Sequence, residues 1–527
     1  MDPHREIELK LSIAPGDAER VLEHPILRAA AVADAEVLHL HSVYFDSRDL
    51  ALGREGISLR LRRGGGRQWQ TLKFGDQSAA GLFARAELEV ELAGERPDLA
   101  AIPDEAVRER VVAVLAGQSL EPIFETEIER THQRLADDTC EWSLDLDRGE
   151  VRAGFAREPI CELELELHRG PPSRLFEIAL TLSDGISLWP GTRSKADRGY
   201  FLRTGERPAP SRAQLPELPG DVTLRDAIVP IARSCLAQIG DNAALAFEGI
   251  EPEGVHQMRV GLRRMRALVV LFRRELPSAR LGRLRGPLRW LAGLLGEVRD
   301  LDVFLEDRIE PLVRRRSADG ALQGLRAEAI ALREERRLVL REALRSRRHA
   351  HLMLELGHWV ASLEELDLAG PPPSEKLVGR ADAFAEIALA RLDRKARKLA
   401  DAALTGPSSA RHDLRIALKK LRYGCEFFRS LYSSKNASKE ASKDAKRYLR
   451  RLSRLQDLLG SQNDIDTAER LLQVLLDRCA PERAIEFARA AGFIEGFAVR
   501  EQERAMRKFS ERWLRFEATR GFWAPKE

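Results

Sequence analysis

Glu6-Ile7-Glu8-Leu9-Lys10-Leu11, near the start of the chain, alternates charged and apolar side chains. This period of two predicts a β-strand whose three charged side chains share one face and whose three apolar side chains share the other. Two carboxylates beside an ammonium group suit a site that holds a divalent cation and, through it, a phosphate chain. Seen alone, the stretch is more typical of the solvated face of an antiparallel strand. Recurrence of the pattern downstream changes that interpretation.

The alternation recurs up to about Tyr200, in short segments separated by Gly, Pro and Asp turns. Clear examples are residues 57–62, 85–91, 142–147 and 161–167. Each has one apolar face and one charged face. Such strands could form a sandwich with its charged faces in water, or a closed barrel with a charged lumen and helices covering its outside. Alternation alone does not choose between the two architectures.

Short charged motifs follow one another in a fixed order along this part of the chain. They are Glu6-x-Glu8-x-Lys10, Tyr44-Phe45-Asp46, Arg60-Leu61-Arg62, Thr71-Leu72-Lys73, Arg85-x-Glu87-x-Glu89, Asp145, Glu162-x-Glu164-x-Glu166 and Ser194-Lys195-x-x-Arg198-Gly199-Tyr200. The set resembles the CYTH family of triphosphate tunnel enzymes over residues 1–203. The resemblance implies an eight-stranded antiparallel β tunnel with covering helices, which binds a triphosphate and a divalent metal inside. Members usually hydrolyse the triphosphate, and some cyclise ATP.

The resemblance also assigns roles to charged residues. It implies that Mg²⁺ or Mn²⁺ is held by carboxylates, the hard oxygen ligands these ions prefer: Glu6, Glu8, Glu87, Glu89, Asp145, Glu162, Glu164 and Glu166. It implies that phosphate oxygens are bound by charge-assisted hydrogen bonds from Lys10, Arg60, Arg62, Lys73, Arg85, Arg130, Lys195 and Arg198. The expected catalytic residues are Glu6, Glu8, Lys10, Lys73 and Lys195. Which two of the carboxylates at 162, 164 and 166 contact the metal stays open, because all three share one face.

The second half of the chain has a different character. Residues 204–220 contain four prolines and little apolar periodicity, which indicates a linker. From Asp221 onward, long Arg-, Leu-, Glu- and Ala-rich stretches with a period of 3.6 predict helices only. The expected organisation is therefore an α+β multidomain protein, with a tunnel domain at 1–203 and an all-α domain at 221–520.

The helical half repeats itself. Residues 255–266 align without a gap on residues 411–422, and residues 294–302 align on residues 458–466. A duplicated helical bundle explains both pairs, with repeats at about 221–370 and 371–520. The candidate polyanion-binding residues come from the first aligned pair: His256, Arg259, Arg263, Arg264, Arg266, His412, Arg415, Lys419, Lys420 and Arg422.

The first of these helices is strongly one-sided in charge. Between Val255 and Trp290 the only acid is Glu275, against ten arginines. An external polyanion is one way to balance such a run, and pairing with acids elsewhere, such as Glu328, Glu334 and Glu335, is the alternative. The two copies with matching histidines resemble the CHAD family over residues 221–520. That resemblance implies two related four-helix bundles whose basic faces bind inorganic polyphosphate. Fusion of the two domains is a pattern that bacterial inorganic triphosphatases display.

Composition sets outer limits on function. Charged residues make up 32% of the 527, hydrophobic residues 44%, and the net charge is +3, as in soluble globular proteins. No apolar stretch suits a signal peptide or a membrane span, so we expect a cytoplasmic protein without membrane contact. The five cysteines lack metal-ligand spacing, which fits reduced thiols.

The leading interpretation is a metal-dependent inorganic triphosphatase, which cleaves tripolyphosphate to pyrophosphate and phosphate and binds longer polyphosphate through its helical domain. One alternative is a non-catalytic protein that binds or targets polyphosphate. Another is a triphosphatase or cyclase acting on thiamine triphosphate or ATP. Nucleic acid is less favoured as a partner, because the basic helices carry few aromatics for base stacking, chiefly Trp290 and Tyr423.

Overall fold

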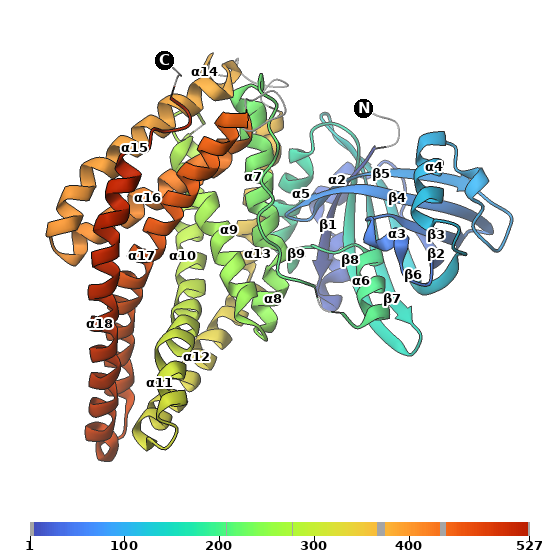
Figure 1. Ribbon diagram of the computed structural model, residues 1–527. Helices are drawn as coiled ribbons and strands as arrows, with labels where there is room; N and C mark the ends of the chain where they lie inside the picture. Colours follow the sequence, from blue (N-terminus) through green and yellow to red (C-terminus); the bar gives the residue numbers. More distant parts are fainter. Residues whose placement is uncertain (1–4, 207, 277, 366–374, 433–438, 525–527) are drawn as a thin grey trace. The chain divides into compact units, whose positions relative to one another are not determined.

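The computed structural model describes residues 5–206, 208–276, 278–365, 375–432 and 439–524 (Figure 1). The chain forms two compact units. Unit 1 comprises Met1–Ala209 and Arg345–Glu365, and unit 2 comprises Pro210–Leu344 and Leu366–Glu527. Residues 345–365 lie inside the range predicted for the first helical repeat, yet they are part of unit 1. The predicted boundary between the repeats, near residue 370, lies outside the described residues.

Unit 1 is built on one antiparallel sheet. Its strands are β1 (Arg5–Ile13), β2 (Glu36–Asp46), β3 (Ser58–Gly64), β4 (Arg67–Ala79), β5 (Leu82–Glu91), β6 (Glu121–Ala136), β7 (Glu141–Ala153), β8 (Ala156–Arg169) and β9 (Leu188–Pro190). Their order is β5-β4-β3-β2-β6-β7-β8-β1-β9, and β1 also pairs with β5. This last pairing closes eight strands into a barrel, which confirms the predicted tunnel and excludes the sandwich. The short β9 pairs with β1 beside it, over Leu11–Ile13.

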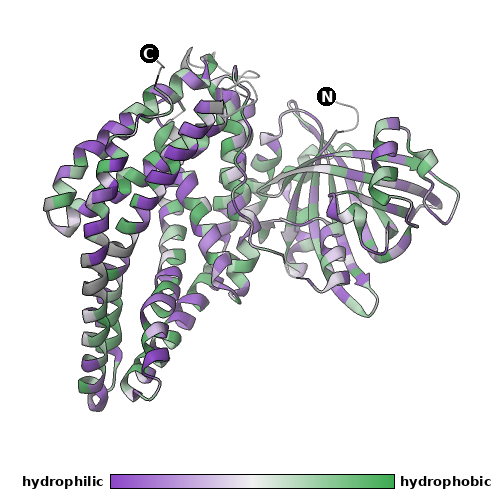
Figure 2. Ribbon diagram, in the orientation of Figure 1, coloured by the Kyte–Doolittle hydropathy of each residue, from purple (hydrophilic) through white to green (hydrophobic). Residues whose placement is uncertain are grey.

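The alternation of side chains explains the barrel. Leu9 and Leu11 of β1 and Leu163 and Leu165 of β8 are fully buried, while the charged residues between them face the opposite way. Figure 2 shows the same alternation of hydrophilic and hydrophobic residues along the strands. Burial of the outer apolar faces under helices stabilises the closed form, so the charged faces are left to line the lumen.

Helices cover the barrel. They are α1 (Ala18–Leu22), α2 (Pro25–Ala30), α3 (Ala51–Arg54), α4 (Glu105–Leu115), α5 (Ser173–Ser183), α6 (Lys195–Thr204) and α13 (Arg347–Glu364). Leu52 of α3 and Val111 of α4 share a core cluster with Leu59 of β3 and Leu72 of β4. In α6, Gly199 lies so close to the Phe124 ring that an added Cβ would approach it to 2.2 Å. Glycine at this position lets α6 pack directly onto the strand.

Unit 2 contains only helices among its described residues, as predicted. They are α7 (Leu224–Asp241), α8 (Ala243–Glu248), α9 (Pro252–Leu271), α10 (Ser278–Val303), the π-helix η3 (Phe304–Ile309), α11 (Glu310–Arg315), α12 (Gly320–Arg345), α14 (Glu375–Val378), α15 (Ala381–Thr405), α16 (Ser408–Phe428), α17 (Lys439–Arg478) and α18 (Ala484–Glu517). The first repeat packs α9 between α7 and α10, and the second packs α16 between α15 and α17. Helices α9 and α16 also contact each other.

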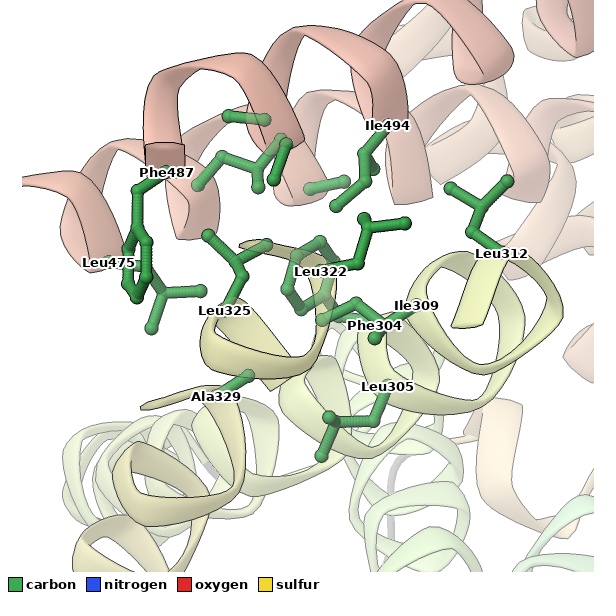
Figure 3. Close-up of a cluster of buried hydrophobic side chains, with 14 of the residues drawn as sticks. Phe304, Leu305, Ile309, Leu312, Leu322, Leu325, Ala329, Leu475, Phe487 and Ile494 are labelled. Carbon is green, nitrogen blue, oxygen red and sulfur yellow. The ribbon is translucent and has the colours of Figure 1, made fainter. Parts of the chain in front are cut away.

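A shared apolar cluster joins the two repeats. Phe304, Leu312 and Leu325 of the first repeat are buried together with Phe487 and Ile494 of α18 (Figure 3). Because these side chains leave water as one group, their burial fixes the two repeats against each other. No helix among the described residues combines the length and the apolar character needed to span a bilayer.

Candidate functional site

The barrel lumen contains a cavity of about 410 Å³ whose lining is mostly charged. Predicted site residues that line it are Glu6, Glu8, Lys10, Arg60, Arg62, Lys73, Arg85, Glu87, Glu89, Arg130, Asp145, Glu164, Glu166 and Lys195. Two predicted residues do not line it. Glu162 is buried and ion-paired with Lys195, and Arg198 of α6 donates to Glu158 over 2.7 Å.

Strand register brings these residues together. Lys10 of β1 lies opposite Glu164 of β8, and Glu164 lies opposite Asp145 of β7. Farther along β1, Glu6 lies opposite Arg85 of β5. The register therefore pairs opposite charges at Lys10/Glu164 and Glu6/Arg85, which stabilises the barrel, but it also places the like charges of Glu164 and Asp145 side by side. Arg130 offsets that repulsion, because it is ion-paired with both carboxylates.

Glu164 is the acceptor for three cations. It is ion-paired with Lys10, with Arg130 at 2.8 Å and with Lys195 at 2.9 Å. Burial alone would raise the pKa of Glu164, but these three neighbours hold it well below its usual range. Glu164 therefore stays ionised and has oxygen atoms available for either an ammonium group or a metal ion.

Local sequence fixes Lys195 in the lumen. Ser194 is the N-cap of α6, and its hydroxyl accepts from the backbone N–H of Asp197 at 3.1 Å. Asp197 in turn accepts from the backbone N–H of Ser194 at 2.8 Å. This capping box makes Lys195 the first helical residue. The Lys195 ammonium group lies 2.7 Å from the carboxylate of Asp147 and 2.9 Å from that of Glu164.

A second ion-pair cluster surrounds Glu6. Lys73 lies 2.7 Å from Glu6 and 3.1 Å from Glu87, and Arg85 bridges Glu6 and Glu8. Burial acts to raise the pKa of Glu87. The positive charges of Lys73 and Arg60 outweigh that effect, so the pKa of Glu87 lies below its usual value. The lumen thus holds most of its cations on its own carboxylates.

Arg60 differs from the other lumen cations. It is 8% exposed, and its Nε and Nη2 atoms have no hydrogen-bond partner among the described residues. Its remaining contacts are long, 3.4 Å to the hydroxyl of Tyr44 and 3.7 Å to Glu87. A buried guanidinium with unused donors is a prepared site for an anion.

Carboxylates suited to a metal ion lie deep in the lumen. Asp147, Glu162 and Glu164 are buried, and each offers an oxygen atom within 4.8 Å of the others. Hard carboxylate oxygens fit Mg²⁺ or Mn²⁺. Asp147 was not among the predicted metal ligands, although it shares its strand face with Asp145 in the 142–147 segment. That shared parity was the signal available in the sequence.

Glu166 lines the cavity in a different charge environment. Burial, and after it the negative charge of Glu6, raises the pKa of Glu166 to about 7. Among the described residues no ion pair is recorded for it, in contrast to Glu164. The three carboxylates of the 162–166 segment therefore differ in their surroundings although they share one face.

The helical unit holds a basic cluster between its two repeats. Arg259 and Arg263 of α9 and Arg415 and Lys419 of α16 lie close enough to affect one another's ionisation. Burial and then these three arginines lower the pKa of Lys419 to about 7. The Nε atom of Arg263 has no hydrogen-bond partner within the described part of the chain. This basic cluster, the α9/α16 cluster, therefore carries excess positive potential.

The other predicted polyanion residues lie in different surroundings. His256 is half-buried near the α9/α16 cluster, and burial followed by Arg299 lowers its pKa, whereas His412 is exposed. Arg264 is buried, donates to Gln238 at 2.9 Å and lies over the Phe427 ring. Arg266 lines a separate cavity of about 260 Å³ with Arg285 and Arg289. Burial, followed by the positive charges of Lys395 and Arg266, lowers the pKa of Lys420. Arg422 donates to Glu426 at 2.6 Å and Gln456 at 3.1 Å.

Acids near the α9/α16 cluster come from the second repeated motif. Asp300 lies 3.8 Å from Arg259. The negative charge of Asp464 partly offsets the lowering of the pKa values of Arg415 and Lys419 by burial and by the neighbouring arginines. Two of the three acids considered as internal partners pair elsewhere, Glu334 with Arg337 and Glu335 with Arg478.

A closed antiparallel barrel with a lumen of carboxylates and cations, joined to a duplicated basic helical bundle, defines the class of this protein. Comparison with protein families agrees with that description. Residues 4–200 match the CYTH domain and residues 230–473 match the CHAD domain. The chain is therefore a fusion of a CYTH domain with a CHAD domain, as its motifs predicted.

Individual relatives cover parts of the chain. An inorganic triphosphatase of Haemophilus influenzae is 30% identical over 199 residues, 38% of this chain and 55% of that protein, so the similarity spans about half of the relative. An uncharacterized protein of Mycobacterium tuberculosis is 27% identical over 378 residues, 65% of this chain and 69% of that protein. The crystal structure of the CHAD domain from the plant Ricinus communis is 31% identical, with a TM-score of 0.49, and the match covers 59% of this chain and 98% of that one.

Proposed function

We propose that the barrel lumen hydrolyses inorganic tripolyphosphate to pyrophosphate and phosphate with the help of Mg²⁺ or Mn²⁺. The observation that carries the proposal is the closed lumen with interleaved carboxylates and cations, in which Arg60 has guanidinium donors to spare. Similarity to a protein named as an inorganic triphosphatase supports the same activity. Among the described residues that line the cavity only Tyr44 is aromatic, and its ring is already stacked on that of Phe124, so little apolar surface is left for an adenine or thiazolium ring.

The ion pairs of the free lumen suggest how a triphosphate is accommodated. Phosphate oxygens take over Lys10, Lys73 and similar cations, and the carboxylates thereby released, Glu164 among them, become available as metal ligands. Because every buried charge exchanges one partner for another, binding avoids leaving an unpaired charge in a site with little water. A bound divalent ion would supply Lewis-acid stabilisation of the charge on the transferred phosphoryl group.

The chain's own residues then orient the reaction. Arg60 and Lys73 hold the substrate's phosphate oxygens, so that the terminal phosphorus is presented to a water molecule in line with the bridging oxygen. Attack of the water forms one P–O bond and breaks the bond to the bridging oxygen. Pyrophosphate leaves with that oxygen, and the water's proton passes to solvent or to a product phosphate. Cations fixed around the lumen stabilise the negative charge of the transition state.

Phosphate release from tripolyphosphate, ATP and thiamine triphosphate, each with Mg²⁺, Mn²⁺ or EDTA, tests the proposal. We expect rapid, metal-dependent release from tripolyphosphate, and much slower release from a Glu6→Gln/Glu8→Gln variant that folds normally. Preference for an organic triphosphate, or cyclic AMP formed from ATP, would replace the inorganic substrate with that one. Absence of turnover with all three substrates would reject the hydrolase and leave a polyphosphate-binding protein.

We further propose that the α9/α16 cluster binds long-chain inorganic polyphosphate. Four cations drawn from both repeats converge there and outnumber the nearby acids Asp300 and Asp464. Glu334 and Glu335 pair elsewhere. A flexible chain of phosphates would neutralise this excess charge without needing base stacking. Competition between polyphosphate and single-stranded DNA on the full-length protein tests the choice of ligand. Equal displacement by DNA would favour a general polyanion site.

Binding to the α9/α16 cluster is expected to weaken as the pH rises from 7 to 9. In the free protein Lys419, with a pKa of about 7, loses its proton in this range, and polyphosphate raises that pKa again by adding negative charge. Affinity should therefore fall by up to about tenfold per pH unit. The groups facing Lys419 are Arg259 and Arg263 of α9, Arg415 of its own helix and Asp464 of α17.

The matched variant is Lys419→Arg, which keeps the charge throughout the range. Calorimetric titration with polyphosphate at pH 7, 8 and 9 should show a steep decline for wild type and a flat profile for the variant. An equally steep decline in Lys419→Arg would assign the pH dependence to another group.

A further inference from the structure

We propose that α13, a helix from within the helical half of the sequence, is a positioning element for the lumen lysines Lys10 and Lys195. The inference rests on the proposed function of the lumen, and it names the element that holds two of the lumen's cations in position. The chain enters unit 1 at Arg345 and leaves it after Glu365, so α13 belongs to the barrel unit although the CHAD match at 230–473 includes it.

Helix α13 fits the surface of α5 at three points along its length. Gly357 lies against the Phe176 ring, where an added Cβ would approach to 2.2 Å. The next residue, His358, makes a polar contact, with its Nε2 atom 3.1 Å from the carboxylate of Glu177. At the end of α13, Glu365 accepts from the backbone N–H of Ser173 at 2.7 Å.

The Glu365 contact is an N-terminal cap for α5 supplied from a distant part of the chain. Ser173 is the first residue of α5, and its preceding residue provides no side-chain cap. A carboxylate that satisfies a free N–H at a helix N-terminus is also favoured by the helix dipole. The contact is therefore specific to this pairing of helices, in addition to the apolar packing between them.

Helix α13 also holds the segment that leads into the lumen. Trp189 of β9 donates its indole N–H to the backbone carbonyl of Arg345, the last residue of α12 and two residues before α13 begins, at 3.0 Å. The Arg347 guanidinium, in the first turn of α13, donates to the carbonyl of Ser183 at the end of α5. Figure 1 shows α13 beside β9 and α5, and the two helices and the strand are in contact. The connection between α5 and β9 is thus bonded at one end to Arg347 of α13 and at the other to Arg345, just before α13, and β9 itself packs against α13.

Strand β9 passes this restraint to both lysines. The backbone N–H of Gly191 donates to the carbonyl of Lys10 at 2.8 Å, and a Cβ on Gly191 would lie 3.0 Å from the Lys10 side chain. Four residues later the chain reaches Lys195, and both ammonium groups are ion-paired with Glu164. Displacement of α13 would therefore loosen β9 and allow the two lysines to move relative to Glu164.

The variant that tests this is Gly357→Ala, because its methyl group would collide with Phe176. The matched control is Gly492→Ala in α18, where an added Cβ meets nothing within 4 Å. Hydrogen exchange of the full-length protein is expected to accelerate over residues 188–198 in Gly357→Ala only. In the same variant kcat for tripolyphosphate should fall about tenfold or more, as a misplacement near 1 Å can produce. Polyphosphate binding by the helical unit should not change.

Two further variants separate positioning from a general loss of folding. Gly357→Ala/Phe176→Leu removes the collision and should restore both exchange and kcat. Trp189→Phe loses a single donor, so exchange over 188–198 should quicken by only about fivefold. Unchanged exchange in 188–198, or equal acceleration throughout the barrel without rescue, would overturn the proposal. If wild type hydrolyses no triphosphate, the proposed function fails, while the exchange result still decides the role of α13.

Discussion

Replacing Arg60 by methionine is expected to lower kcat/KM for tripolyphosphate by about 10²- to 10³-fold, the effect of removing one donor to a developing anion. The same change should leave the unfolding temperature at or above the wild-type value. Arg60 is buried, and two of its nitrogen atoms have no hydrogen-bond partner among the described residues. Its nearest carboxylate, Glu87 at 3.7 Å, keeps Lys73 at 3.1 Å when the arginine is gone.

Differential scanning fluorimetry beside a phosphate-release assay measures both effects. Arg85→Met provides the contrast, because Arg85 bridges Glu6 and Glu8, and its removal should lower stability as well as activity. Arg152→Met, on the outer face of the barrel, is the control and should keep wild-type turnover. A large drop in the unfolding temperature of Arg60→Met would mean that Arg60 supports the fold instead of awaiting an anion.

The difference between Arg60 and the other lumen cations is a stability–function trade-off within one site. Lys73 and Arg85 repay the cost of their burial by pairing with carboxylates in the free protein. Arg60 does so only when a ligand arrives. An anion that satisfies Arg60 therefore displaces only the long contact with Glu87 at 3.7 Å, and it uses donors that have no hydrogen-bond partner among the described residues.

The strands and their charged faces could be predicted because that information is local. A period of two in Glu6–Leu11 fixes which side chains share a face, and the period recurs along the first 200 residues. The choice of a closed barrel over a sandwich came instead from the resemblance of the ordered motifs to the CYTH family, because closure depends on the distant pairing of β1 with β5. The helical half was predictable for the same reason, since a period of 3.6 and two gapless repeats are visible in the sequence. Both predictions are confirmed by the strand pairing and by the described helices.

Details that depend on distant partners could not be predicted. The period of α9 does not reveal that Arg264 packs against Phe427 and Gln238 while Arg263 joins the α9/α16 cluster, because both partners come from other helices. The sequence likewise does not reveal that residues 345–365 belong to the barrel unit, because their partners lie far away along the chain. The period of α13 is that of an ordinary amphipathic helix, and the residues that tie it to the barrel unit, such as Glu177 and Ser173, lie 181 and 192 residues earlier than their partners His358 and Glu365.

A Glu164→Gln variant is expected to lose both metal affinity and stability. Glu164 belongs to the buried group with Asp147 and Glu162, so its loss should weaken Mn²⁺ binding at least tenfold to a hundredfold, as even outer-shell changes do. Turnover at a fixed, low metal concentration should fall at least as far. Loss of a carboxylate that pairs with Lys10, Arg130 and Lys195 should also destabilise the fold by about 3 kcal/mol.

Electron paramagnetic resonance of Mn²⁺ and thermal unfolding test the two effects separately. The matched control is Glu129→Gln, on the outer face of β6, whose exposed ion pair with Arg148 at 3.4 Å should be worth less than about 1 kcal/mol. Partial recovery of turnover at high metal concentration would support a role for Glu164 as a ligand. Wild-type Mn²⁺ affinity in Glu164→Gln would move the metal to the carboxylates around Glu6 and Glu87, and Lys195 would then be the permanent partner of the Asp147, Glu162 and Glu164 group.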